Sequence, residues 1–237
     1  MGTTIEDIQY EEAWCKFHQE IVMKNAAISQ CIYVFVEGES EETAVPILLD
    51  RLNIDMEDFG IVVANYNGIG NLGHSIRLLG KTLSHDRPVI ITFDNDKEGK
   101  RIIGTVSNPI FTEFPIPLTP VVTYSDGHAG GSFEESFSPE TFIRACFTPE
   151  LIGAHLSNME VIFRSCFDNA RPWFSQVAQF IQSNGGQATQ LNKPKIAEYM
   201  AEHCDPIPDT YIKLSEKLID LRAQNPIKHP EDVDVPR

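Results

Sequence analysis

Residues 32–41 read IYVFVEGESE, an apolar run of β-branched and aromatic residues that stops at a group of acidic ones. A second run of the same kind covers residues 89–96 and reads VIITFDND. Short, continuously apolar strands with helical patterns between them are typical of a parallel sheet that is covered on both faces. We therefore predict an α/β fold with a central, mostly parallel sheet flanked by helices.

The rest of the chain is organised around this sheet. Two further strands are predicted, at residues 61–64 and around residues 121–124, and an amphipathic helix over residues 7–25 is expected to lead into the sheet. Helices are predicted from about residue 41, over much of 97–107, and at 139–147, 171–183, 193–203 and 210–223. We expect three parts, which are an N-terminal helical lead-in (1–29), a sheet-containing core (30–137) and a helical C-terminal region (138–237).

Acidic residues follow two of the predicted strands and recur after a glycine-rich stretch at residues 126–131. The carboxyl ends of parallel strands meet at one crevice, which is the usual ligand site of an open α/β sheet. Carboxylates crowded there repel one another unless cations are present, and Mg²⁺ prefers oxygen ligands. We predict a magnesium site, with Mn²⁺ as an expected substitute. Its candidate ligands are Glu37, Glu41, Asp94, Asp96, Ser132, Glu134 and Glu135.

Each acidic group also has a structural interpretation. The acids after residue 38 could complement a helix dipole, and one of Asp94 and Asp96 is expected to cap the next helix. Gly38 is expected to permit a tight turn after Glu37. An aspartate pair can also mark a phosphatase of the haloacid-dehalogenase type, but those enzymes place the pair on their first strand and here it follows the third.

Composition excludes several classes of protein. The 237 residues carry a formal charge of −15, which argues against a simple basic nucleic-acid binder. No apolar run approaches the roughly 20 residues needed to cross a bilayer, and the acidic N-terminus does not resemble a signal peptide. Five widely spaced cysteines without a CxxC pair indicate neither a zinc site nor a disulfide framework. We expect a cytoplasmic protein without a membrane partner.

The order strand-Glu-Gly, βα units, strand-Asp-x-Asp resembles the Toprim domain, and residues 36–41 are most similar to the version in OLD (overcoming lysogenization defect) nucleases. That resemblance covers roughly residues 30–205. It implies a second glutamate at Glu41, a later acidic element at Glu134 and Glu135, and a downstream lysine, for which Lys193 is the better candidate and Lys195 the second. Ser132 stands where the family would lead us to expect an acid.

The resemblance implies a metal-dependent endonuclease that hydrolyses DNA phosphodiester bonds by a two-metal mechanism. Glu37, Asp94 and Lys193 would be catalytic, and the role would be in phage defence or DNA repair. OLD proteins also carry an ABC-type ATPase, so we expect an ATPase domain or subunit as partner, and possible homo-oligomers. The Gly80-Lys81-Thr82 triplet lacks the first glycine of a Walker A loop.

Three alternatives stay open at this point. One is another Toprim chemistry, as in topoisomerases or primases, although neither a gate nor a zinc module is visible in the sequence. Another is a non-catalytic Toprim module that serves assembly or regulation. The last is a phosphotransferase in which Asp94 is the nucleophile.

Overall fold

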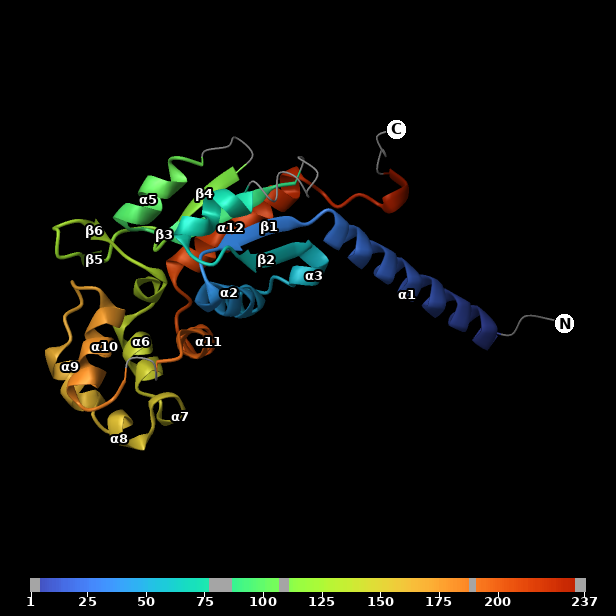
Figure 1. The fold of residues 1–237 in the computed structure, drawn as a ribbon. Helices are drawn as coiled ribbons and strands as arrows, with labels where there is room; N and C mark the ends of the chain where they lie inside the picture. Colours follow the sequence, from blue (N-terminus) through green and yellow to red (C-terminus); the bar gives the residue numbers. More distant parts are fainter. Residues whose placement is uncertain (1–4, 77–86, 107–110, 188–190, 233–237) are drawn as a thin grey trace.

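The computed structural model describes residues 5–76, 87–106, 111–187 and 191–232, which form a mixed α/β fold (Figure 1). Within these residues the central sheet has four parallel strands in the order β2-β1-β3-β4. Their bounds are β1 Ile32–Val36, β2 Ile61–Asn65, β3 Val89–Asp94 and β4 Phe111–Ile116. The predicted parallel α/β architecture is confirmed, and the two strands that carry the acidic groups, β1 and β3, are the central pair.

Alternating side chains of the central strands pack on the two faces of the sheet. Val34 and Ile90 belong to a large core that the C-terminal helices share, whereas Phe35 and Ile91 belong to a smaller core on the opposite face. All four side chains are nearly inaccessible to solvent. Burial on both faces explains why these strands lack the polar alternation of a sheet with one wet side.

Helices cover both faces of the sheet. The elements that follow β1 in the chain are α2 Glu39–Arg51, α3 Met56–Phe59, η1 Ile69–Asn71, α5 Lys97–Ile103, η2 Phe133–Ser136, α6 Pro139–Cys146, α7 Pro149–Ile152, α8 Ala154–Ser157, α9 Glu160–Cys166, α10 Trp173–Ser183, α11 Lys193–His203, α12 Asp209–Gln224 and η4 Pro230–Asp232. Helix α11 returns from the C-terminal region to pack against α2 and α6, and α12 contacts α2 and β1. The Gly80-Lys81-Thr82 triplet lies outside the described residues.

The fourth strand lies earlier in the chain than predicted. Residues 121–124 do not join the central sheet, because β5 Val122–Thr123 pairs antiparallel with β6 Ala129–Gly130 in a separate hairpin. The true fourth strand, β4, contains Glu113 and Pro115, which interrupt the apolar pattern. Proline is tolerated there because β4 is an edge strand that pairs only with β3 within the described chain.

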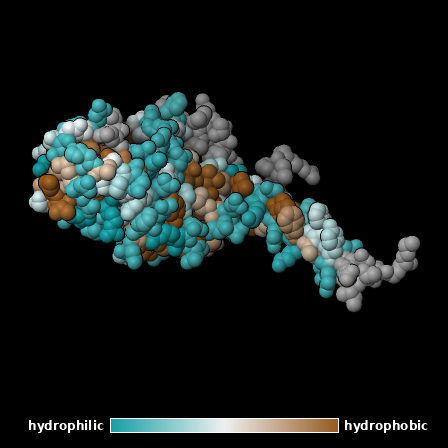
Figure 2. All heavy atoms as spheres, turned by 90° about the horizontal axis from the view of Figure 1, so that it is seen from below, coloured by the Kyte–Doolittle hydropathy of each residue, from teal (hydrophilic) through white to brown (hydrophobic). Residues whose placement is uncertain are grey.

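The N-terminal helix differs from the prediction in its packing. Helix α1 Ile5–Ser29 leads into β1 as expected, but it projects away from the body of the protein (Figure 1). Ala26 and Ala27, near its end, are buried, and the helix contacts α3, β2 and η4 there. Figure 2 shows apolar side chains on the surface of this projecting helix. Trp14, Phe17 and Ile21 are exposed, so these side chains of the expected amphipathic lead-in do not contribute to the sheet's core.

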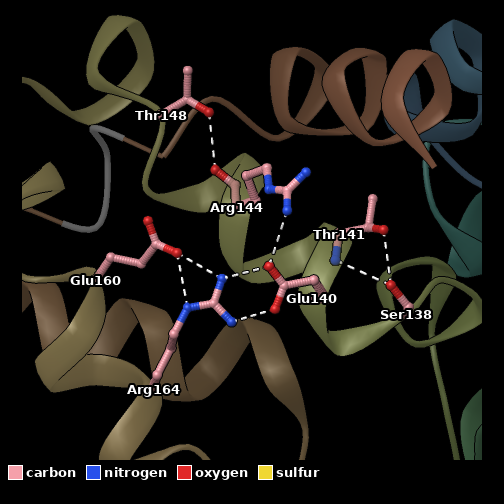
Figure 3. Close-up of polar contacts among 7 residues, drawn as sticks. All are labelled: Ser138, Glu140, Thr141, Arg144, Thr148, Glu160 and Arg164. Atoms are coloured by element: carbon pink, nitrogen blue, oxygen red, sulfur yellow. Dashed lines mark hydrogen bonds and ion pairs between the residues drawn. The ribbon is translucent and has the colours of Figure 1, made fainter. Parts of the chain in front are cut away.

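The helical region beyond residue 138 shares one continuous core with the sheet, and aromatic side chains such as Phe142, Phe163 and Trp173 fill it. Polar contacts join its helices at the surface (Figure 3). The guanidinium of Arg164 on α9 donates to Glu160 and also to Glu140 on α6. Helix α11 of this region packs directly on the sheet's own helix α2. The division at residue 138 stays a prediction.

Candidate metal and catalytic site

Two carboxylates, at the carboxyl ends of β1 and β3, lie at the centre of the site. Glu37 follows β1, and its Oε1 accepts a hydrogen bond from the Ile69 N–H (3.2 Å) while its Oε2 accepts one from the Asp94 N–H (3.3 Å). Asp94 is the last residue of β3, and its Oδ1 accepts a hydrogen bond from the Phe133 N–H (3.1 Å). Backbone donors from η1 and η2 therefore orient both carboxylates toward the same end of the sheet.

Glu41 reaches the site from the first turn of α2. The helix begins at Glu39 with Gly38 as its N-cap, so Glu37 precedes the helix and the two glutamates are not neighbours on one helical face. The chain bends at Glu37 and Gly38, but Gly38 is extended (φ −152°) and an added Cβ would meet only the Glu41 Oε2, at 3.7 Å, so the bend does not require glycine. Glu41 is nevertheless brought beside Glu37, because α2 starts where β1 ends.

These groups line a pocket of about 420 Å³. Its lining residues are Glu37, Gly38, Glu39, Ser40, Glu41, Asn67, Gly68, Asp94, Phe133, Glu134, Lys193 and Pro194. Four of the seven predicted metal ligands (Glu37, Glu41, Asp94 and Glu134) and the predicted lysine thus come together from β1, α2, β3, η2 and α11.

Lys193 is the cation of this pocket. Its Nζ lies 3.4 Å from the Glu134 Oε1 and 4.1 Å from the centre of the Phe174 ring, so an ion pair and a cation–π contact both hold it. The structure places Lys195 elsewhere, because that side chain lines a separate pocket with Glu150 and Glu202. The geometry therefore favours the first of the two lysine candidates.

The three remaining candidates make contacts of a structural kind. The Asp96 carboxylate caps α5 by accepting a hydrogen bond from the Gly99 N–H (2.6 Å), as expected for one of the aspartate pair. The Glu135 carboxylate accepts hydrogen bonds from the N–H groups of Ser132 and Trp173. The Ser132 hydroxyl lies within hydrogen-bond distance of Glu134 and Glu135. None of the three lines the pocket, and their role as metal ligands stays a prediction.

Part of the chain is similar to a known protein family. Residues 32–96 match the family model described as "Overcoming lysogenization defect protein-like, TOPRIM domain". This segment is similar to the Toprim domain of OLD proteins. No curated protein sequence matches the chain.

Solved structures of OLD proteins resemble the chain in fold. The C-terminal region of the OLD protein from Xanthomonas campestris pv. campestris aligns with a TM-score of 0.52 and 18% identity, covering 81% of this chain and 94% of that one. The corresponding region of the Burkholderia pseudomallei OLD protein aligns with a TM-score of 0.49 and 17% identity, covering 80% and 96%. At such low identity the likeness concerns the fold alone.

The Toprim segment supplies only part of the pocket. Glu37, Glu41 and Asp94 lie inside the matched residues, whereas Glu134 and Lys193 come from the chain that follows. Sequence reasoning did not foresee the contacts that position these groups, such as the N–H of Ile69 and the ring of Phe174. The glycines and asparagines of residues 65–70 are typical of a loop, but nothing in the sequence pairs position 174 with position 193.

The pocket disfavours negative charge at its acidic groups. Burial raises the pKa of Glu41 to about 8, and the charges of Glu134 and Glu37 add to the effect. Burial also raises the pKa of Asp94 well above its usual value, with further increases from Glu37 and Glu41. The pKa of Glu37 is raised mainly by burial as well. All three shifts favour the protonated form of the carboxyl, and added positive charge would oppose them.

The donor chemistry fits a hard divalent cation, because crowded carboxylate oxygens are the ligands that Mg²⁺ and Mn²⁺ take. Their present arrangement is not a ready-made coordination sphere. Among the described residues, no three His, Cys, Asp or Glu side chains already stand in a group that could hold a metal ion. Binding a cation at this pocket would therefore require some of these side chains to move closer together.

Proposed function

We propose that this chain is a metal-dependent endonuclease that hydrolyses DNA phosphodiester bonds in the pocket at the carboxyl ends of β1 and β3. The convergence of four predicted metal ligands (Glu37, Glu41, Asp94 and Glu134) and Lys193 in that pocket carries the proposal. The OLD-like Toprim match of residues 32–96 supports it, since the matched segment contributes three of these four ligands. DNA as substrate, and Mg²⁺ or Mn²⁺ as the metal, are parts of this proposal.

Glu37, Glu41, Asp94 and Glu134 would hold the metal, and Asp96, Ser132 and Glu135 would complete or support the set. A divalent metal here would activate water and neutralise charge on the phosphate. Backbone N–H groups orient both side chains, since they donate to both oxygens of Glu37 and to the Oδ1 of Asp94. The Ile69 and Phe133 N–H groups thereby limit how the two carboxylates can turn.

Lys193 would stabilise negative charge on the phosphoryl group as the transition state forms. Its ammonium group already lies at the pocket, 3.4 Å from Glu134, and the Phe174 ring restricts its position from the other side. When a cation shares Glu134, the ion pair with Lys193 would weaken, and the ammonium group would be available to a phosphate oxygen.

Three further parts of the proposal concern the protein's surroundings. We infer a cytoplasmic protein that works with an ABC-type ATPase domain or subunit in phage defence or DNA repair, by analogy with the OLD family. Within the described residues no helix has both the length and the apolar character that a membrane span requires.

The decisive experiment is cleavage of supercoiled plasmid with Mg²⁺, with Mn²⁺ and with EDTA. We expect nicking or linearisation that needs the metal and falls by at least about 1,000-fold in an Asp94→Asn variant, because that substitution removes a central carboxylate without changing its size. An Asp50→Asn variant, on the exposed surface of α2, is the matched control and should keep full activity.

Two outcomes would contradict the proposal. Full-rate cleavage by the Asp94→Asn variant would show that the pocket is not the catalytic site. Absence of cleavage in either metal, even with ATP and a cognate ATPase present, would favour the non-catalytic Toprim module. A trapped aspartyl-phosphate at Asp94 would instead identify the phosphotransferase alternative.

A further inference from the structure

Glu135 is buried (4% exposed), and its carboxyl group joins two elements that are far apart in the sequence. Its Oε2 accepts a hydrogen bond from the N–H of Ser132 (2.7 Å), and its Oε1 accepts one from the N–H of Trp173 (2.8 Å), the first residue of α10. The first bond is the ordinary contact of a capping glutamate with the start of its own helical turn. The second spans 38 residues of the chain, so Glu135 does more than cap η2.

Helix α10 has no side-chain cap of its own. Its N-cap is Pro172, which makes no side-chain hydrogen bond to the helix, so Glu135 satisfies the N–H with which the helix begins. A buried N–H without an acceptor is costly, and a carboxylate is favourable at a helix N-terminus. The Trp173 ring belongs to the large core and holds α10 against the body, whereas Glu135 ties the start of the helix to η2.

The two elements joined by Glu135 carry the two contacts of the pocket's lysine. Phe174 follows Trp173, and the centre of its ring lies 4.1 Å from the Lys193 Nζ. Glu134 precedes Glu135, and its Oε1 lies 3.4 Å from the same nitrogen. The Lys193 side chain is half exposed (52%), and ordering such a long side chain costs conformational entropy that its contacts must offset. Its position therefore depends on the placement of η2 relative to α10.

We propose that Glu135 is a positioning residue of the acidic pocket rather than one of its metal ligands. By tying η2 to α10, it keeps Glu134 and the Phe174 ring at the spacing that holds Lys193 between them. Both Glu135 oxygens are already engaged by backbone N–H groups, and the side chain does not line the pocket. The inference rests on the proposed nuclease function, because it states how the lysine of that reaction is held.

A Glu135→Gln substitution breaks this link at almost constant size. A glutamine side chain has one acceptor oxygen and one NH₂ donor group. Whichever way the amide turns, the N–H of either Ser132 or Trp173 then faces a donor. The matched control is Glu140→Gln, because the Glu140 carboxylate also joins two helices, through Arg164, but lies outside the pocket (Figure 3).

The position of Lys193 can be measured without any catalysis. In the metal-free whole chain labelled with ¹³C at the lysine ε-carbons, protons that lie over the Phe174 ring resonate upfield of those in other lysines. Loss of a signal in Lys193→Ala assigns it, and Phe174→Leu gives its position without the ring. We expect Glu135→Gln to move this signal toward the Phe174→Leu position and Glu140→Gln to leave it in place.

Plasmid cleavage tests the consequence for the reaction. We expect Glu135→Gln to lower kcat by about 10- to 100-fold, because a displaced ammonium group stabilises the transition state less well. The same substitution should cause no further loss in a Lys193→Ala background, since Glu135 acts through that lysine. Glu140→Gln should cleave at the rate of the unaltered chain.

Two results would overturn the proposal. They are an unmoved Lys193 signal in Glu135→Gln, and equal losses of activity from this substitution with and without Lys193, as a metal ligand would give. If Glu135→Gln does not fold, Glu135→Asp must move the signal instead, because its shorter side chain cannot reach both N–H groups. A chain that cleaves no DNA would contradict the nuclease proposal, while the lysine signal would still decide the role of Glu135.

Discussion

Glu41 shows how a single buried carboxyl can respond to both protons and metal. With a pKa of about 8, it is largely protonated in the folded protein at neutral pH, whereas an ordinary glutamate is ionised. The retained proton keeps Glu41 neutral, so the negative charges of Glu37 and Glu134 do not repel it. Metal that binds to the pocket must displace such protons, so its affinity should increase as the pH rises.

The same pKa predicts how metal-free stability changes with pH. Between about pH 4.5 and 8 the folded state holds a proton on Glu41 that the unfolded state has lost, so the free energy of unfolding falls as the pH rises. This group alone contributes about 1.4 kcal/mol per pH unit in that window. We expect a steeper fall in melting temperature from pH 5.5 to 8 for the unaltered protein in EDTA than for a Glu41→Gln variant.

Scanning calorimetry at several pH values gives this comparison directly, and the variant controls for the titration of other groups. Parallel curves for the two proteins would show that Glu41 is ionised normally in the folded state. Saturating Mg²⁺ should reduce the difference between the melting temperatures of the unaltered protein at pH 5.5 and at pH 8, because the metal then takes the place of the proton.

Lys193 and Lys195 allow a closely matched test of the catalytic lysine. Both are exposed side chains in the first turn of α11, but only Lys193 lines the acidic pocket. Loss of a charge that stabilises the transition state should lower kcat by about 100- to 1,000-fold in Lys193→Ala, with little change in metal affinity. Lys195→Ala should cleave plasmid at a rate close to that of the unaltered protein. Equal losses in both variants would assign the effect to general attraction of DNA.

At the scale of single residues, the sequence predicted that Glu37 and Asp94 lie close together, but not the contacts that hold the site's side chains in place. Glu37 and Asp94 could be placed together because the carboxyl ends of adjacent parallel strands lie at one edge of a sheet. The Phe174 ring beneath Lys193 could not, because it depends on how α10 packs beside α11. Asp96 and Glu135 were included with the ligands for their charge, but the charge of each is also used to cap a helical segment.

Among the elements, the β5–β6 hairpin determines where the second half of the site lies. Gly130 packs so closely on the turn after β3 that an added Cβ would lie 2.5 Å from the Asn95 carbonyl oxygen and 3.2 Å from the Asp96 Cα. The Gly131 N–H also donates a hydrogen bond to the Asn95 oxygen. The segment from Ser132 to Glu135 follows directly, so this close approach fixes the distance between Glu134 and Asp94.

A Gly130→Ala substitution should therefore affect stability and activity together. We expect a loss of about 1–3 kcal/mol in the free energy of unfolding, because the hairpin must move away from the turn. Plasmid cleavage should fall further than stability alone would explain, since Glu134 moves with the hairpin. Gly70→Ala is the control, because no atom lies within 4 Å of the added Cβ. Urea unfolding at 25 °C measures the first effect, and an unchanged midpoint would contradict it.

The elements were predictable where one physical signal governed them. Strands β1, β2 and β3 are short and almost wholly apolar, and the structure confirms their positions. Strand β4 was missed because Glu113 and Pro115 are acceptable only on an edge, and edge position is a property of the whole sheet. Residues 121–124 look equally strand-like, but their partner is the nearby hairpin residue pair at 129–130.

For the whole molecule, the C-terminal helices complete a site that the sheet begins. Helix α11 lies more than 150 residues after β1 in the chain, yet it carries Lys193 to the ends of β1 and β3. The parallel α/β class and the helical character of the C-terminal region were both predictable. The projection of α1 was not, because an amphipathic pattern predicts a helix without showing which surface covers its apolar side chains.

The acidic pocket has a consequence for the order of events in a reaction cycle. A phosphodiester and a cluster of carboxylates are both anionic, and the chain as a whole carries a charge of −15. DNA would therefore be expected to enter the proposed site second, after cations have reversed the local potential. Free divalent metal would then act as a gate on substrate entry, and kinetics at subsaturating metal should show a compulsory order with metal first.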